Sequence, residues 1–153
     1  MNENLARLCE LQADVFEKSS SFTCGSKYFM FRFFQSEVAK RIDEAGPAIP
    51  LPSAQEAIES LLEEYPSLNE RGGKKLSLPL LRWIGYVTRA YSSLTHCPSF
   101  RLLKEIPIEK LVSLYDVYHT FDVEYAVERL KEIVLDNRGQ ETEITLLRKV
   151  YGI

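Results

Sequence analysis

Apolar side chains recur along most of this chain at the three- and four-residue spacing with which an α-helix buries one face. The first stripe of this kind occupies Leu5, Leu8, Gln12, Val15 and Phe16. It should end in the three serines at residues 19–21, because serine side chains compete for backbone hydrogen bonds. Every strong period in the chain is close to 3.6 residues, so the pattern predicts an all-α fold.

Capping residues, glycines and prolines divide the rest of the chain into further helices. The expected segments are residues 26–46, 53–65, 77–97, 107–118 and 122–135, with short helical turns over 99–105. Ser53 and Glu56 form a capping-box pattern, and Pro79 follows Ser77 where a helix begins. Residues 137–153 fit a helix or a docked strand, and a peripheral tail is also compatible with their sequence. We expect one helical domain over residues 1–153, a bundle of about six or seven helices.

Length and composition fit a chain that folds alone. The 153 residues match one domain, and the 45% hydrophobic and 27% charged fractions are those of ordinary globular proteins. No secretory signal is visible, and the apolar run at residues 28–31 is far shorter than the roughly 20 residues of a membrane span. Three cysteines and two histidines without close pairing argue against disulfides and zinc. We therefore expect a cytoplasmic protein with no metal, no cofactor and no membrane.

Charge is distributed unevenly along the chain. The segment from Arg71 to Lys104 has seven basic residues and no Asp or Glu, whereas the remainder has a net charge of −10 and the whole chain −3. Basic side chains in this segment recur every seven residues, close to two helical turns, at Lys75, Arg82, Arg89 and His96. Such an asymmetry exceeds what the average composition suggests.

Two interpretations of the cationic segment stay open. In one, it is a partner-binding surface formed by Lys75, Arg82, Trp83, Tyr86, Arg89 and His96. An acidic protein suits this surface better than nucleic acid, which the negative total charge repels. In the other, the cationic helix packs against the acidic helix at residues 53–65 and is neutralised within the fold. Gly85 in the cationic helix predicts the close approach of another backbone, since glycine there costs about 1 kcal/mol relative to alanine.

Arg89 and His96 also resemble the Arg–His motif of HEPN ribonucleases, helical proteins in which a dimer brings two such pairs together to cut RNA. An imidazole moves protons near neutral pH, while a guanidinium stabilises a crowded phosphate. The permitted spacings are loose, and Ala90 stands where such families have a polar residue. This likeness implies a ribonuclease as an alternative function.

Other reactive residues give weaker signals. Asp116 and His119 lie one turn apart, where they would orient an imidazole or hold a metal, but a helix end with His119 near free carbonyls is the ordinary interpretation. Asp122 is then the N-cap of the next helix. Cys24 precedes Gly25 near a helix start, with no base beside it in sequence to make it a nucleophile.

The segments Trp83–Arg89 and Tyr115–Thr120 carry a further resemblance. They are similar to a family of small, functionally uncharacterised bacterial proteins with W-x-G-Y-x-x-R and, roughly thirty residues later, Y-x-x-Y/F-H-T, followed by an amphipathic helix like residues 123–135 here. The likeness covers about the C-terminal half, with weaker similarity around residues 28–42. Some members lie in toxin–antitoxin-like gene neighbourhoods, which implies a partner-binding or antitoxin-like role.

These observations favour a non-enzymatic cytoplasmic protein-binding module, antitoxin-like or an accessory component of a toxin–antitoxin-type cassette. One alternative is a HEPN-like ribonuclease that uses Arg89 and His96. The other is a structural or oligomerisation protein, and a homo-oligomer stays open for all three functions.

Overall fold

The computed structural model describes residues 1–152, apart from the side chain of Glu141; residue 153, the end of the predicted tail, lies outside the described part. The α-helices are α1 (Glu3–Lys18), α2 (Ser26–Gln35), α3 (Glu37–Asp43), α4 (Ala54–Glu64), α5 (Leu78–Thr95), α6 (Ser99–Glu105), α7 (Ile108–Tyr118) and α8 (Val123–Tyr151). Two short 3₁₀ helices, η1 (Ser19–Ser21) and η2 (Pro66–Asn69), complete the elements. The described residues form no strand, which confirms the all-α prediction.

The expected number of six or seven helices is too low, since the described part of the chain forms eight α-helices. Residues 26–46 form two helices because Ser36 leaves helical geometry, with φ −80° and ψ 160°. Its hydroxyl accepts a hydrogen bond from the amide of Ala39 at 3.1 Å and so caps α3. Residues 137–151 continue α8 as a helix and do not form a strand.

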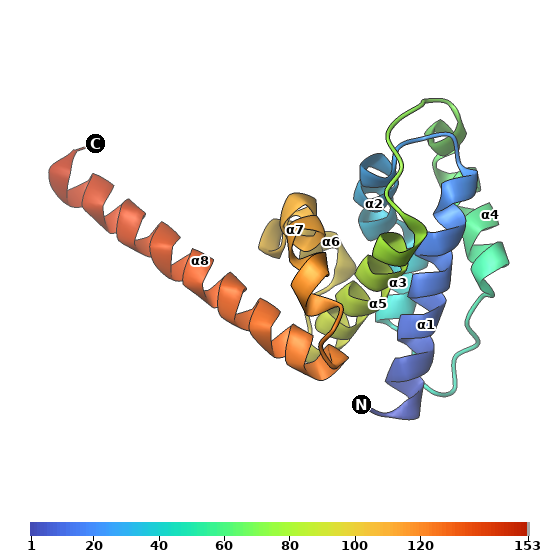
Figure 1. Cartoon of the computed structure of the whole chain (residues 1–153), viewed down its shortest axis with the longest axis horizontal. Helices are drawn as coiled ribbons and strands as arrows, with labels where there is room; N and C mark the ends of the chain where they lie inside the picture. The colour runs from blue at the N-terminus through green and yellow to red at the C-terminus, as the bar shows by residue number, and fades with distance from the viewer. Residues whose placement is uncertain (153) are drawn as a thin grey trace.

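The centre of the molecule is the contact between α1 and α5, which lie side by side (Figure 1). A Cβ built on Gly85 of α5 would lie 2.7 Å from the carbonyl oxygen of Gln12 and 3.0 Å from the Cα of Ala13. The two helix backbones therefore touch at Gly85, which confirms the close approach expected there.

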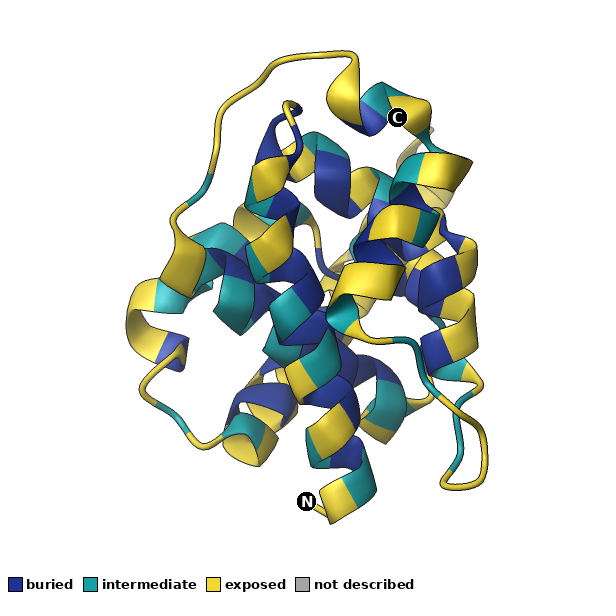
Figure 2. Cartoon of the chain, turned by 90° about the vertical axis from the view of Figure 1, so that its right-hand side faces the viewer, coloured by how far each residue is buried: buried dark blue, intermediate teal, exposed yellow. Residues whose placement is uncertain are grey.

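Phenylalanine side chains join α2 to the centre of the molecule. The ring of Phe16 lies 4.9 Å from that of Phe33 and 5.2 Å from that of Phe29, both in edge-to-face geometry. Figure 2 shows the buried residues along the inner faces of the helices, with exposed residues on the outside and in the loops. Aromatic pairs of this kind add about 0.5–1.5 kcal/mol beyond the area they bury.

The last helix, α8, is the longest, and only its first part packs on the body. Its 29 residues span about 43 Å. Buried side chains in its first part are Ala126, Val127, Leu130 and Val134. Beyond them the helix extends away from the other helices, as Figure 1 shows. None of the described helices is at once long enough and apolar enough to cross a bilayer.

Candidate functional site

The six residues of the predicted partner surface lie in different environments. Lys75 lies in the loop before α5 and donates hydrogen bonds to the carbonyl oxygens of Phe22 and Cys24. Trp83 and Tyr86 are partly buried on α5. Because Arg89 of the same helix is only 1% exposed, the six residues do not form one continuous exposed surface.

Arg82 is neutralised by α1. Its guanidinium donates to the carboxylates of Asp14 at 2.5 Å and Glu17 at 3.1 Å, and also to Glu10. Of the two interpretations, neutralisation within the fold holds for Arg82, but the acidic helix is α1 and not α4, which packs against α1. With three acids around one base, this part of the surface is acidic.

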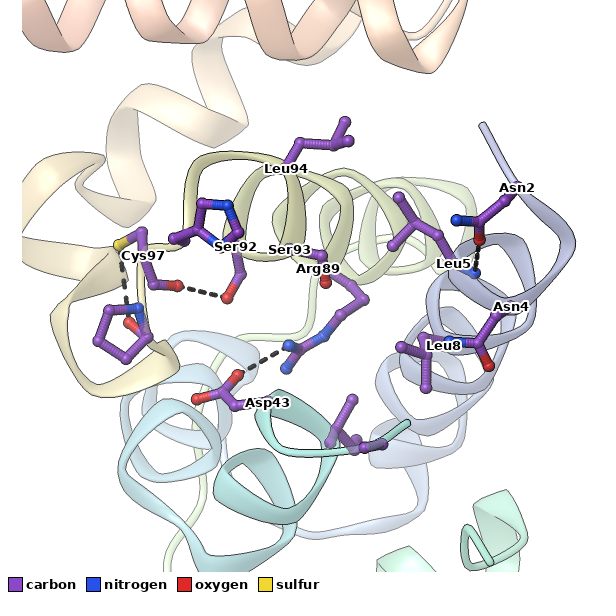
Figure 3. Close-up of a pocket in the computed structure, with 14 residues that line it drawn as sticks. Asn2, Asn4, Leu5, Leu8, Asp43, Arg89, Ser92, Ser93, Leu94 and Cys97 are labelled. Atoms are coloured by element: carbon purple, nitrogen blue, oxygen red, sulfur yellow. Dashed lines mark hydrogen bonds and ion pairs between the residues drawn. The ribbon is translucent and has the colours of Figure 1, made fainter. Parts of the chain in front are cut away.

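Arg89 belongs to a buried polar network inside the fold. Its Nε donates to Gln12 Oε1 at 2.9 Å, its Nη1 to Asp43 Oδ1 at 2.7 Å and its Nη2 to Ser99 Oγ at 3.1 Å. Asp43 also accepts from the amide of Ser99 at 2.9 Å. Burial lowers the pKa of Arg89, while the carboxylate of Asp43 acts in the opposite direction. Figure 3 shows Arg89 reaching from α5 toward Asp43.

Arg89 and His96 line the same groove, of about 620 Å³, between α1 and the end of α5. His96 is exposed and ends α5 in the left-handed conformation, with φ 56° and ψ 32°. The groove is also lined by Asn2, the N-cap of α1, and by Asn4 in the first turn of that helix (Figure 3). All three guanidinium nitrogens of Arg89 already donate to acceptors of the fold, so this geometry gives no support to the ribonuclease pair.

A second groove, of about 390 Å³, is aromatic and lies between α5, α7 and the start of α8. The rings of Trp83 and Tyr115 meet edge to face at 5.6 Å, and His119 stacks on Tyr115 at 4.4 Å. Tyr86 lines the same groove, and burial raises its pKa. The segments Trp83–Arg89 and Tyr115–Thr120, which are far apart in sequence, therefore meet at this groove.

His119 lies at a helix end, the ordinary interpretation of its position. Its Nδ1 is 2.6 Å from the carbonyl oxygen of Tyr115. Asp122 occupies the N-cap position of α8 as expected, although its side chain makes no capping hydrogen bond. No group of His, Cys, Asp and Glu side chains in the described part of the chain is arranged to hold a metal ion.

The cysteines lie in surroundings that suppress the thiolate. Cys9, Cys24 and Cys97 are free and buried. Burial raises the pKa of Cys9 to about 12 and that of Cys97 to about 11. Burial also raises the pKa of Cys24, although Lys75 acts in the opposite direction. A nucleophilic role needs a lowered thiol pKa, and the surroundings of Cys24 do the reverse.

The end of α8 is the feature that our reading of the sequence missed. We call residues 144–151 the α8 tip. Large apolar side chains in it are 48–73% exposed, namely Ile144, Leu146, Leu147, Val150 and Tyr151. At about 100° per residue these five positions fall within an arc of roughly 160°. The ion pair of Arg138 with Glu105, at 2.6 Å, is the last described one that joins α8 to the body, so the tip projects beyond it.

None of the protein-family models, curated proteins or solved structures compared with this chain matches it. The geometry of its own residues is therefore what supports a function. The spacing of Ile144, Leu147 and Tyr151, three and seven residues along, was the sequence signal for the apolar face of the tip.

Proposed function

We propose that this chain is a non-enzymatic protein-binding module whose α8 tip inserts into an apolar groove of a partner protein. The observation that supports this proposal is the exposure of the apolar face of the tip, whose five large side chains are 48–73% exposed. Exposed faces of this kind mark interaction sites in soluble proteins. Helix-in-groove recognition uses the same spacing of apolar anchors on one face of a helix.

The area of the tip favours a different protein over a second copy. Five side chains that are about half to three-quarters exposed offer roughly 400–500 Å² of apolar surface. Two tips packed face to face would bury about 800–1,000 Å², below the roughly 1,200–2,000 Å² of stable interfaces. A groove that encloses the helix covers its flanks as well, and so reaches a larger area.

Basic side chains at the α8 tip indicate the charge of the partner's groove. Arg148 and Lys149 lie in the last turn of α8, beside the apolar face. They sit where the helix dipole is negative, so they stabilise the helix end and remain exposed to a partner. An apolar groove with an acidic rim complements this tip; the acidic partner expected from the sequence was assigned to the cationic segment and not to this helix end.

The finer role follows from the resemblance to the bacterial family. Because some members of that family lie in toxin–antitoxin-like gene neighbourhoods, we propose an antitoxin-like or accessory role. Three free cysteines support a reducing compartment, the cytoplasm, as the place where the chain acts.

The test compares four forms of the full chain as baits in lysate of the native host, with quantitative mass spectrometry. The forms are the unchanged chain, Leu147→Lys, Val150→Lys and the control Thr142→Lys, which adds the same charge on the polar side of α8. A partner that fits the proposal is retained by the unchanged chain and the control and falls at least tenfold with the two tip variants, or about 1.4 kcal/mol.

Equal retention by all four forms would refute the tip as the binding site. Light scattering at increasing protein concentration tests whether the tip instead binds a second copy of the chain. We expect the 17.6 kDa monomer throughout. A dimer that Leu147→Lys abolishes would instead make the chain its own partner.

A further inference from the structure

The cationic segment keeps free charge at its N-terminal end. Arg82 and Arg89 are paired with carboxylates inside the fold. Arg71 and Lys74 are exposed, Arg32 on α2 is partly buried, and none of the three forms an ion pair with a described carboxylate. Cations without a carboxylate partner remain available to an anionic ligand.

The loop that carries Arg71 and Lys74 is held against the start of α2. The amide of Ser26 donates to the carbonyl oxygen of Lys74 at 2.9 Å, and Thr23 Oγ1 donates to that of Arg71 at 3.0 Å. A Cβ built on Gly73 would lie 2.6 Å from the nitrogen of Gly25, so the two backbones touch. The loop of residues 70–77 is therefore fixed in place without regular secondary structure.

Aromatic rings orient the arginines of this region. The guanidinium of Arg71 lies 4.1 Å from the ring centre of Tyr28. Arg32 lies 5.4 Å from the same ring and 5.5 Å from that of Phe31, which is 46% exposed. The hydroxyl of Tyr28 is 2.6 Å from Ser67 Oγ and accepts from Arg32 Nε at 3.1 Å, and these bonds lower its pKa.

We name Tyr28, Phe31, Arg32, Arg71 and Lys74 the Tyr28 patch. A guanidinium stacked on a ring can still donate hydrogen bonds from its N–H edge to a phosphate. Its plane, like an exposed aromatic ring, can stack on a nucleic acid base. Carboxylates alone would use the cations and leave the exposed Phe31 ring without a partner, whereas a nucleotide supplies a phosphate and a base together. Cations interleaved with aromatic rings are the chemistry of single-strand binding surfaces.

Neighbouring acids limit the patch on one side. Burial raises the pKa of Tyr65, and the nearby carboxylates of Glu64 and Glu37 raise it further. The guanidinium of Arg32 lies 5.0 Å from the centre of the Tyr65 ring. Glu70, next to Arg71 in the chain, is also exposed, and acids farther away than about 8 Å are screened at physiological ionic strength. The net charge of −3 therefore does not prevent local binding of phosphates.

We propose that the Tyr28 patch binds single-stranded nucleic acid, with phosphates on Arg32, Arg71 and Lys74 and a base on Phe31. About three phosphates contact the protein in this arrangement. Their release of counterions gives a slope of about −2 for the logarithm of the binding constant against the logarithm of the salt concentration. The site is separate from the α8 tip, so it goes beyond the proposed function.

The test measures fluorescence anisotropy of a labelled 12-residue oligouridylate with the full chain between 50 and 200 mM salt, roughly the range over which phosphate contacts respond. Arg71→Gln should weaken binding at least fivefold and reduce the salt slope by about 0.7. Phe31→Ala should weaken binding at least fivefold with the slope unchanged, because the ring carries no charge. Arg7→Gln removes an exposed cation elsewhere and should change binding less than twofold.

Three results would overturn the proposal. One is the absence of binding at 50 mM salt by a chain whose helical spectrum is intact. Another is equal binding by the Arg71→Gln and Arg7→Gln variants, when circular dichroism shows both folded. The third is displacement of the oligouridylate by polyglutamate as effectively as by unlabelled oligouridylate, since this would show that any polyanion, an acidic protein included, satisfies the patch.

Discussion

Replacement of Arg89 by methionine tests the buried network most directly. Methionine keeps much of the arginine stem but removes the guanidinium, which is 1% exposed and donates to Gln12, Asp43 and Ser99. The carbonyl oxygen of the Gln12 side chain then loses its partner in a side chain that is 0% exposed.

The magnitude follows from what the substitution leaves unpaired. Breaking a buried ion pair costs about 3–5 kcal/mol. Asp43 is 17% exposed and retains two hydrogen bonds from Ser99, at 2.7 and 2.9 Å, so the lower end applies. We expect Arg89→Met to reduce the free energy of unfolding by about 3 kcal/mol and the melting temperature by roughly 6–12 °C.

Urea unfolding followed by circular dichroism measures the change. Arg82→Met is the matched control, because its three ion pairs are exposed and should contribute only about 1 kcal/mol together. Adding Asp43→Leu to Arg89→Met should recover part of the loss, since no buried carboxylate is left without its cation. A cost below about 1 kcal/mol for Arg89→Met would refute the structural role and return the residue to the ribonuclease hypothesis.

Three other substitutions or conditions test the fold. Gly85→Ala should destabilise the protein by about 1–3 kcal/mol in urea unfolding, despite the better helix propensity of alanine, because the new Cβ meets the backbone of α1. Gly139→Ala is the control: its new Cβ would have open space around it, so this variant should not be destabilised. Arg82→Glu should lower the free energy of unfolding by about 1–2 kcal/mol, because it places a fourth carboxylate beside Glu10, Asp14 and Glu17. This loss of stability should be smaller at 1 M salt, and an unchanged loss at high salt would contradict the pairing of Arg82 with α1. Raised pKa values of Cys9 and Cys97 mean that the folded chain keeps these protons when the unfolded chain loses them near pH 8.5. Stability should therefore be full below that pH and fall toward pH 11, and Cys9→Ala should reduce the fall in the urea midpoint between pH 8 and pH 10.

Local signals in the sequence predicted most helix bounds. Ser53 and Glu56 form the expected capping box, with both hydrogen bonds present, and Ser77 caps α5. Ser36 was missed because the apolar spacing of α2 and α3 continues across it. These boundaries depend on residues close together in the chain, which is why a single sequence contains them.

The environments of the charged residues could not be predicted in the same way. Helical spacing indicates that Arg82 and Arg89 share a face, but it does not say which helix lies opposite or how deep each residue is buried. The polar Gln12 within the apolar stripe of α1 was the signal for a buried polar partner, and it receives a hydrogen bond from Arg89. The α8 tip was missed for a different reason, since an apolar face in sequence does not show whether the fold covers it.

The length of α8 also has a consequence for how the two proposed ligands would share one small chain. Helix geometry places Tyr151 about 20 Å beyond Arg138, the last residue paired with the body. A protein held by the tip therefore stands on a rigid spacer away from the Tyr28 patch. The two proposed sites share no residues, so we expect a partner and a nucleic acid strand to bind independently, with additive free energies.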